Sequence, residues 1–203
     1  MSAFLNARFL ASADKLPDIP PETVPELAFA GRSNVGKSSA INALASRRRL
    51  AFSSKTPGRT RTINFFDLGN RGRLADLPGY GYASAPRAVR AGWGALVGGY
   101  ISRRRSLAGV VLLMDARHPL TAGDRQFLDW LAPVATRRMV LLSKSDKLSR
   151  TAGAAALAAV RRALARFADP GAVLLFSSRS GEGVAAARAL LERWLADARQ
   201  GPK

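Results

Sequence analysis

Short apolar segments alternate along most of the chain with longer segments of helical periodicity. The apolar segments lie at residues 26–31, 62–68, 73–77, 107–115, 137–143 and 172–178. Segments whose apolar positions recur every three or four residues lie at 37–45, 85–104, 121–132, 149–168 and 181–199. Continuously apolar strands that alternate with helices are typical of a parallel sheet covered on both faces. The pattern therefore predicts an α/β fold with a doubly wound sheet.

The chain is long enough for one well-buried domain and short for two, with 203 residues of which 47% are hydrophobic. Residues 1–25 hold four of the eleven prolines and predict an irregular lead-in. We expect a single domain at 26–199 and a short tail at 200–203. In a doubly wound sheet, ligands bind at the carboxyl ends of the strands, so the residues after each strand are the candidates for a site.

Basic residues greatly outnumber acidic ones, with 32 Lys and Arg against 14 Asp and Glu and a formal net charge of +18. Arginine runs lie at 47–49, 103–105, 137–138 and 161–166. Any one run is typical of a solvated helix end or loop, but the sum favours a polyanionic partner such as nucleic acid.

The sequence offers no targeting or membrane signal. No window approaches 18 uninterrupted apolar residues, and the first residues lack the apolar core of a secretory signal. The absence of cysteine excludes disulfides and thiolate metal sites. We expect a cytoplasmic protein without membrane insertion, and a monomer by default.

The segment "GRSNVGKSS" follows the first apolar strand and precedes a helical pattern. It matches G-x-x-x-x-G-K-[ST], whose glycines let the backbone wrap an anion while the lysine reaches the terminal phosphates and the serine ligates Mg²⁺. The predicted phosphate-binding residues are Gly31, Arg32, Ser33, Asn34, Val35, Gly36, Lys37 and Ser38.

The segment "DLPGY", after the third apolar strand, supplies the second half of a nucleotide switch. Asp76 is placed to hold Mg²⁺ through a water, and the Gly79 amide to meet a γ-phosphate, with Leu77 and Pro78 between them. A polar loop, "SSKTPGRTRTINFF", separates this segment from the phosphate loop. Its threonines Thr56, Thr60 and Thr62 are candidate Mg²⁺ ligands that their chemistry alone does not separate.

Lys144-Ser145-Asp146 follows the fifth apolar strand and forms a K-x-D motif. A carboxylate accepts hydrogen bonds from the ring N–H and exocyclic amine of guanine, which adenine lacks, so Asp146 predicts a guanine site. After the last strand, Ser177 and Ser178 offer backbone amides to the guanine carbonyl. Asp146 thus opposes an ATPase.

The segments "GRSNVGKSS", "KTPGRTRTINFF", "DLPGYGYA", "DARHPLT" and "SKSDKL" together resemble the EngB (YihA/YsxC) family of bacterial GTPases, within the Era/EngA-related group, over about residues 5–195. The resemblance implies a Ras-like P-loop GTPase domain with a six-stranded, mostly parallel sheet and helices on both faces. It also implies GTP and Mg²⁺ as ligands, a role in assembly of the large ribosomal subunit, and the older label of a cell division or septation GTPase.

Several site residues are carried over by position from this resemblance. Ser38 and Thr60 correspond to the Mg²⁺ ligands, and Lys37, Thr60 and Gly79 to the catalytic positions. Ser143 stands where the family usually has threonine. The remaining correspondences are the first switch at Gly58, Arg59, Thr60, Arg61 and Thr62, the base segment at Ser143, Lys144, Ser145 and Asp146, and the last base contact at Phe176, Ser177 and Ser178.

Tyr80 occupies the place after Gly79 where a polar side chain would position the attacking water. A phenol cannot copy a carboxamide there, so we expect Tyr80 to pack outward or to support the switch, and intrinsic turnover to be slow, on the order of 10⁻⁴ to 10⁻² s⁻¹. Acceleration then comes from a group of the ribosomal partner or from K⁺ held by Asn34, whose alternative role is to stabilise a turn.

Two functions remain open at this point. One is a GTPase switch that binds a ribosome precursor, through rRNA or ribosomal proteins, in its GTP state. The other is a nucleotide-stabilised adaptor for RNA or the ribosome with negligible hydrolysis. We expect structural roles for the lone His118 and for Trp93, Trp130 and Trp194.

Overall fold

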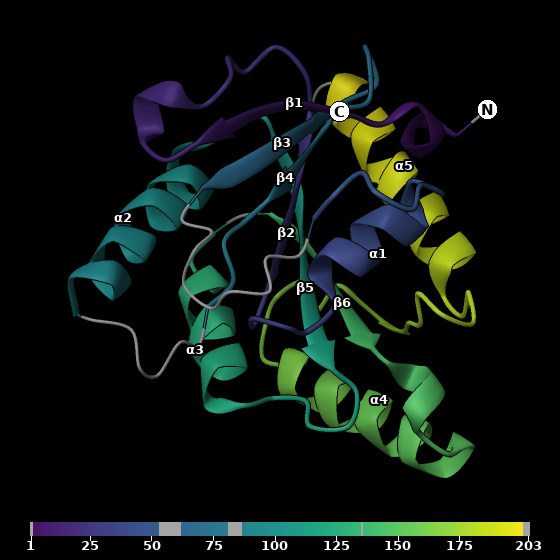
Figure 1. Ribbon diagram of the computed structural model, residues 1–203. Coiled ribbons are helices and arrows are strands. Elements are labelled where there is room, and N and C mark those ends of the chain that lie inside the picture. The colour runs from purple at the N-terminus through teal and green to yellow at the C-terminus, as the bar shows by residue number, and fades with distance from the viewer. Residues whose placement is uncertain (1, 53–61, 81–86, 135, 201–203) are drawn as a thin grey trace.

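A sheet of seven strands, ordered β1-β3-β4-β2-β5-β6-β7, forms the centre of the molecule (Figure 1). The structure, a computed structural model, describes residues 2–52, 62–80, 87–134 and 136–200, with the backbone alone at 87–93. The strands are β1 (Arg8–Ala13), β2 (Glu26–Gly31), β3 (Ile63–Asp67), β4 (Arg73–Asp76), β5 (Leu107–Asp115), β6 (Arg137–Ser143) and β7 (Ala172–Leu175). Neighbours from β4 through β7 pair in parallel, whereas β3 is antiparallel to both β1 and β4.

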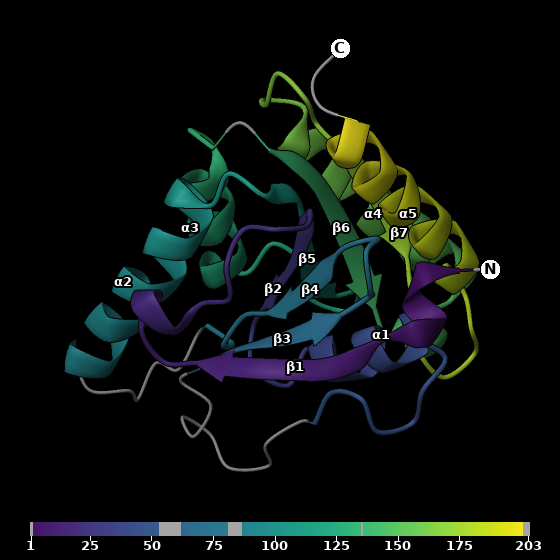
Figure 2. The same cartoon turned by 90° about the horizontal axis from the view of Figure 1, so that it is seen from above.

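Helices cover both faces of this sheet, which confirms the predicted α/β class. One buried cluster joins the sheet to α2, α3 and α4, and a second joins it to α1 and α5. Figure 2 shows α2 and α3 on one side of the sheet and α1 and α5 on the other. None of the described helices is long and apolar enough to cross a membrane. The helices are α1 (Lys37–Leu44), α2 (Arg87–Arg103), α3 (Ala122–Leu131), α4 (Arg150–Leu164) and α5 (Val184–Gln200).

The central strand β2 explains why the strands appear as unbroken apolar runs. All six of its residues are buried. Leu27 and Phe29 belong to the cluster under α1 and α5, while Ala28 and Ala30 belong to the opposite cluster. Because successive side chains face opposite sides of a sheet, a strand covered on both faces must be apolar at every position.

The sheet contains one more strand than the six predicted, and the prediction of an irregular lead-in is wrong for residues 8–13. These residues form β1, which pairs antiparallel with β3 at the edge of the sheet, from Arg8 opposite Asp67 to Ala13 opposite Ile63. Phe9 and Leu10 are exposed, so the strand lacks the buried alternation that identifies a strand in sequence. Backbone pairing across 50 or more residues defines it instead.

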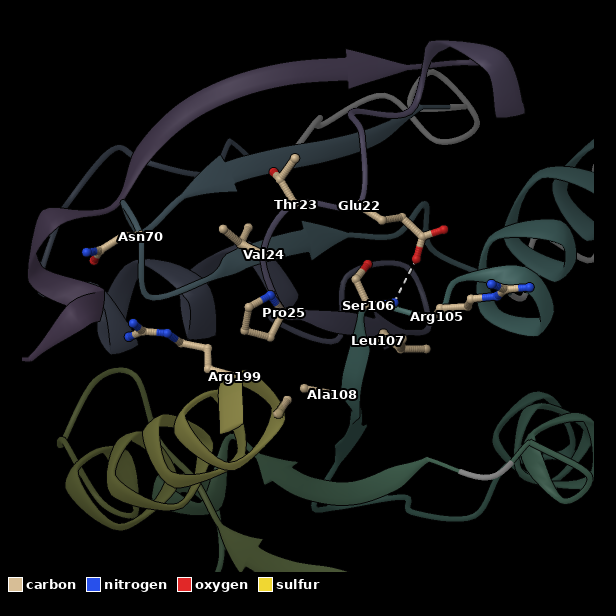
Figure 3. A pocket seen from close by; sticks show the side chains of 11 residues that line it. Glu22, Thr23, Val24, Pro25, Asn70, Arg105, Ser106, Leu107, Ala108 and Arg199 are labelled. Atoms are coloured by element: carbon tan, nitrogen blue, oxygen red, sulfur yellow. Dashed lines mark hydrogen bonds between the residues drawn. The ribbon is translucent and has the colours of Figure 1, made fainter. Parts of the chain in front are cut away.

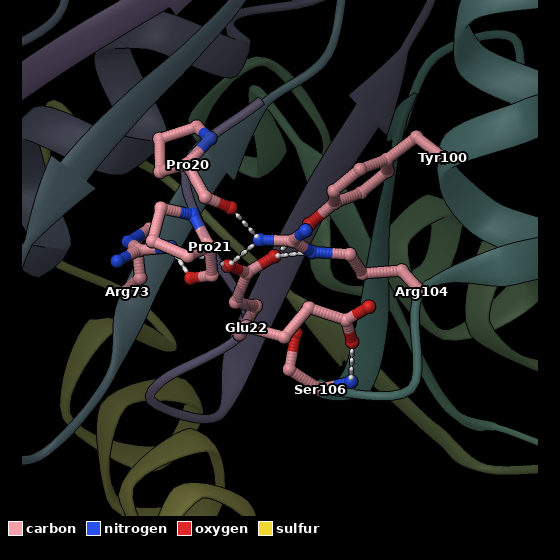
Figure 4. A network of polar contacts seen from close by, with 8 residues as sticks. Pro20, Pro21, Glu22, Arg73, Tyr100, Arg104 and Ser106 are labelled. Carbon is pink, nitrogen blue, oxygen red and sulfur yellow. Dashed lines mark hydrogen bonds and ion pairs between the residues drawn. The ribbon is translucent and has the colours of Figure 1, made fainter. Parts of the chain in front are cut away.

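A buried ionic network closes the amino end of the sheet, at the start of β2 (Figure 4). Glu26 is fully buried and accepts hydrogen bonds from Arg73 at 2.8 Å, from Arg104 at 2.7 and 2.9 Å, and from the Tyr100 hydroxyl at 2.8 Å. Burial, reinforced by the neighbouring carboxylate, raises the pKa of Tyr100 well above its ordinary value, so the phenol remains a neutral donor. The network joins β2, β4 and α2 around a fully buried carboxylate.

We expect Glu26→Gln to lower the free energy of unfolding by about 3–5 kcal/mol, because two buried guanidinium groups lose their counter-charge while the volume is kept. Urea unfolding measures this. The control is Asp197→Asn at the exposed pair with Arg137, which joins Nη1 and Oδ2 at 2.7 Å and should contribute less than about 1 kcal/mol. Equal losses in the two variants would contradict the buried network's role.

Candidate nucleotide-binding site

The carboxyl ends of the parallel strands lie along one edge of the sheet, and the predicted motifs follow them. Gly31, Asp76, Asp115 and Ser143 are the last residues of β2, β4, β5 and β6. Parallel pairing keeps these ends together, as shown by Asp115 opposite Ser143. The fold therefore brings together motifs that are more than a hundred residues apart, at the edge where open α/β sheets bind ligands.

Residues 31–38, the phosphate loop, connect β2 to the N-terminus of α1. Gly36 has a φ of 102°, a left-handed conformation that glycine adopts without strain, and its carbonyl accepts the first helical bond from Ala40 N at 2.9 Å. Val35 is buried and attaches the loop to the core. A glycine turn that leads into a helix N-terminus is suited to binding phosphate groups.

Lys37 and Asp76 form an ion pair at the centre of this edge. The Lys37 ammonium donates to Oδ1 of Asp76, and the two side chains are only 13% and 6% exposed. Among the described residues, no group of three or more His, Asp or Glu side chains is placed to hold a metal. Mg²⁺ nevertheless needs only one or two protein oxygens, because phosphate and water oxygens complete its coordination. The carboxylate of Asp76 and the hydroxyl of Ser38 fit this requirement.

The segment 76–80 lies directly against the phosphate loop. Tyr80 N donates to Gly31 O at 3.3 Å, and Ser33 N donates to Tyr80 O at 3.1 Å. A Cβ on Gly79 would lie 2.8 Å from Ser33 Oγ and 3.1 Å from Ser33 N, closer than real Cβ atoms approach. A side chain at position 79 would therefore force the Ser33 side chain and backbone to shift.

The base segment, residues 143–146, is bonded to the other side of the phosphate loop. The Ser143 hydroxyl lies 2.7 Å from Val35 O and 3.1 Å from Met114 O. The Lys144 ammonium donates to Asn34 O and to Asp115 Oδ2, both at 3.0 Å. Serine at 143, the departure from the family pattern, thus supplies a hydroxyl that supports the loop.

Asp146 is held by the segment that follows β7. Its Oδ1 accepts a hydrogen bond from the Ser177 hydroxyl at 2.7 Å, and this bond lowers the pKa of Asp146. Ser145 completes the connection, since its hydroxyl donates to Glu182 Oε2 at 2.6 Å and its amide to Phe176 O at 3.3 Å. The two predicted base-contacting segments are therefore adjacent.

Two residues of this edge were missed by the sequence reasoning. Asp115 is buried and accepts from Arg117 and Lys144, and the bonds from Arg117 first and Lys144 second lower its pKa despite its burial. Glu182 holds Ser145. The position of Asp115 as the last residue of an apolar strand was a usable signal in the sequence, but nothing local marks Glu182.

The first-switch prediction falls mostly outside the described residues. Gly58, Arg59, Thr60 and Arg61 belong to residues 53–61, as does the alternative Mg²⁺ ligand Thr56. Thr62 is described, and its hydroxyl donates to Asn64 Oδ1 at 3.3 Å.

Comparison with known proteins identifies the family. A family model described as a 50S ribosome-binding GTPase matches residues 26–144. A protein named "Probable GTP-binding protein EngB" from Azoarcus sp. (strain BH72) is 52% identical to the chain, over 98% of the chain and 95% of its own length. A protein of the same name from Thiobacillus denitrificans (strain ATCC 25259 / T1) is also 52% identical, over 94% of the chain and 91% of its own length. The chain belongs to the EngB family of GTP-binding proteins. It is a GTPase, as its motifs predict.

Solved structures agree with the EngB fold. A crystal structure of a probable GTP-binding protein EngB superposes with a TM-score of 0.66 at 21% identity, covering 85% of this chain and 99% of the other. A crystal structure of Era in complex with MgGDPNP and nucleotides 1506–1542 of 16S ribosomal RNA superposes with a TM-score of 0.64 at 16% identity. The superposition covers 85% of this chain and 57% of the Era chain. At these identities the likeness shows the fold alone.

Tyr80 of this EngB chain faces the protein interior. Only 8% of it is exposed, its ring stacks on Phe127 with centroids 5.3 Å apart, and its hydroxyl donates to Asp124 Oδ1 at 2.7 Å. Burial first, and the Asp124 carboxylate second, raise the pKa of Tyr80, so the phenol is a neutral donor. Of the two predicted alternatives, outward packing is wrong, and the contacts made by Tyr80 support the switch segment.

The residues expected to be structural are found in such roles where they are described. Trp194 is buried, and Trp130 packs edge-on against Phe127. His118 is exposed in the loop after β5, where its amide donates to Asp115 O at 3.0 Å. The side chain of Trp93 lies outside the described residues.

An open cavity of about 410 Å³ lies at the opposite, amino end of the sheet (Figure 3). Its lining includes Glu22, Pro25, Arg105, Ser106 and Arg199. None of the residues predicted from the nucleotide motifs lines this cavity.

We expect Tyr80→Phe to lower the free energy of unfolding by about 1–3 kcal/mol, because the buried Asp124 carboxylate loses a donor. Single-turnover GTP hydrolysis should change little, since the phenol bonds to α3 and not to the phosphate loop. Lys37→Ala is the control that removes turnover. A large loss of turnover in Tyr80→Phe at unchanged stability would show instead that the phenol acts in the chemical step.

Proposed function

We propose that this EngB-family GTPase binds GTP and GDP with Mg²⁺ across the edge of the sheet, and that its nucleotide state controls binding to the large ribosomal subunit or its precursor. The observation that carries the nucleotide part is the direct bonding of the base segment to the phosphate loop through Ser143 and Lys144. Two segments that would contact opposite ends of one nucleotide are thereby fixed relative to each other.

The phosphate end is assigned to residues 31–38 and 76–79. Backbone amides of the phosphate loop and the N-terminus of α1 bind the phosphates, Lys37 neutralises the terminal oxygens, and the Gly79 amide meets the γ-phosphate. Ser38 and Thr60 ligate Mg²⁺ directly, and Asp76 holds it through water. The ion supplies charge neutralisation of the phosphates when it is bound. Lys37 must leave Asp76 for the phosphates, so binding exchanges one ion pair for others.

The base end is assigned to Asp146 and the segment after β7. The hydrogen bond from Ser177 lowers the pKa of Asp146, so the carboxylate is ionised at neutral pH and accepts from the two guanine donors. The Ser177 and Ser178 amides are assigned to the guanine carbonyl, and the Lys144 stem covers the base. An adenine would leave the carboxylate without its donors.

Asp146→Asn tests this assignment by exchanging one acceptor for a donor. In the variant, the amide N–H of the new asparagine faces the exocyclic amine of guanine, so two donors oppose each other. Xanthine has a carbonyl in place of that amine, and the carbonyl accepts the hydrogen bond. We expect GTP affinity to fall at least about a hundredfold and XTP affinity to rise above it. Titration with labelled GTP, XTP and ATP measures the change, with Asp129→Asn on the exposed face of α3 as control. Unchanged preference for GTP would remove Asp146 from the base site.

Hydrolysis by these groups alone is proposed to be slow. The Tyr80 hydroxyl donates to Asp124, and a phenol does not supply the carboxamide that orients the attacking water in other GTPases. We propose that the ribosomal partner supplies an accelerating group in trans. K⁺ bound at Asn34 is the second candidate, because Asn34 is exposed in the phosphate loop at a φ of 62°. Equal turnover in sodium and potassium would exclude the ion.

The ribosomal partner is supported by charge and by the family. The net charge of +18 favours a polyanion, and the matching family model is described as ribosome-binding. The structurally similar Era is solved with a 16S ribosomal RNA fragment. An adaptor with negligible hydrolysis is the second candidate, favoured by the engagement of Tyr80 with Asp124.

We expect purified large ribosomal subunits to bind the chain more tightly with a non-hydrolysable GTP analogue than with GDP, and to release it steeply as salt rises. Co-sedimentation over a salt series measures both. Equal affinity for the subunits in the two nucleotide states would favour the adaptor. An affinity that does not change with salt concentration would contradict an RNA contact.

A further inference from the structure

Residues 46–52, the arginine loop, lie on the outside of the fold after α1 (Figure 2). Arg47, Arg48 and Arg49 are exposed, whereas Leu50 and Ala51 are 8% and 4% exposed and belong to the core cluster under α1 and α5. The loop thus presents three consecutive guanidinium groups, and the two residues that follow them are buried.

The arginine loop is held in place by side chains from two helices. Asn42 of α1 accepts from Leu50 N at 3.0 Å and Ala51 N at 2.7 Å, and donates to Ala51 O at 2.8 Å. Arg188 of α5 donates to Ser46 Oγ at 2.9 Å and to Ala43 O at 3.1 Å. A loop fixed in this way loses little conformational entropy on binding a partner.

The arginines of the arginine loop have no acidic partner among the residues that the structure describes. Between Glu26 and Asp67 the sequence contains eight basic residues and no acidic one. In the part of the chain that the structure describes, no ion pair involves Arg47, Arg48 or Arg49. By contrast, Arg104 and Arg166, from two of the other runs, are paired with Glu26 and Asp129.

Phe52 ends the arginine loop and is 76% exposed, the highest value among the large hydrophobic side chains that the structure describes. An aromatic ring open to water beside three arginines offers a flat apolar face next to a cationic strip. Bases of unpaired nucleotides stack on such rings, and their phosphates pair with arginine.

We propose that the arginine loop binds single-stranded RNA, with phosphates on Arg47, Arg48 and Arg49 and one unpaired base stacked on Phe52. This inference rests on the proposed ribosomal partner and names the surface that contacts it. A single-stranded element is specified because a paired base has no free face for Phe52. The loop is followed in the sequence by residues 53–61, which contain most of the predicted first switch. The RNA-binding loop and the predicted nucleotide-sensing segment are therefore consecutive in the chain.

The test is fluorescence anisotropy with a labelled single-stranded RNA of about 12 nucleotides, using the full chain with a non-hydrolysable GTP analogue. Phe52→Ala should weaken binding about tenfold, and Phe52→Trp should retain it. A strand of the same length without bases should bind the wild type and Phe52→Ala equally. Binding of duplex RNA should likewise be insensitive to Phe52.

The arginines are tested by salt dependence. Log affinity falls as log salt concentration rises. Replacing Arg47, Arg48 and Arg49 by glutamine should make this fall shallower, reducing the magnitude of the slope by about 2. The matched control replaces Arg150, Arg161 and Arg162, three exposed arginines of α4, by glutamine and should change the slope much less. Equal changes in the two triple variants would show diffuse attraction and overturn the proposal. Unaltered binding by Phe52→Ala, or tighter binding to anionic lipid vesicles than to RNA, would overturn it as well.

Failure of this inference is distinguishable from failure of the proposed function. If wild-type chain does not bind large subunits in the GTP state, the ribosomal proposal fails. If the wild type binds them and the arginine-loop variants bind equally well, only the loop assignment fails. All loop variants should keep wild-type GTP affinity, because none of these residues belongs to the nucleotide site.

Discussion

Three backbone carbonyls of the phosphate loop are held by donors from other segments, and the site depends on these bonds. Gly31 O accepts from Tyr80 N, Asn34 O from the Lys144 ammonium, and Val35 O lies 2.7 Å from the Ser143 hydroxyl. Carbonyl dipoles that would repel phosphate are thereby engaged within the protein. The backbone of such a loop is already arranged to bind an anion, and preorganised dipoles of this kind give strong electrostatic stabilisation.

Asp124 gives the second switch segment a comparable attachment. One carboxylate oxygen accepts from the Tyr80 hydroxyl, and the other accepts from Thr121 in the capping box that starts α3. Movement of Tyr80 would therefore leave a buried acceptor without its donor, at a cost of about 1–3 kcal/mol. A partner that binds a state in which Tyr80 has moved must supply that free energy.

The sequence predicted those parts of the candidate site whose residues lie close together along the chain. The phosphate loop, Asp76 and the Lys144–Asp146 motif were predicted because each stands at the carboxyl end of an apolar strand. The strand β1 was missed because its side chains are exposed and only its pairing with β3 defines it. Glu182 and the Asp124 partner of Tyr80 were missed because these contacts join residues 37 and 44 positions apart. No pattern along the chain encodes such contacts.

The most direct test of a timed switch is single-turnover GTP hydrolysis in potassium and in sodium, with and without purified large ribosomal subunits. We expect slow turnover by the chain alone and an acceleration of at least about tenfold by the subunits, because the proposal has the partner supply the water-positioning group. Subunits that bind the GTP state but leave the rate unchanged would contradict the switch and identify the chain as an adaptor.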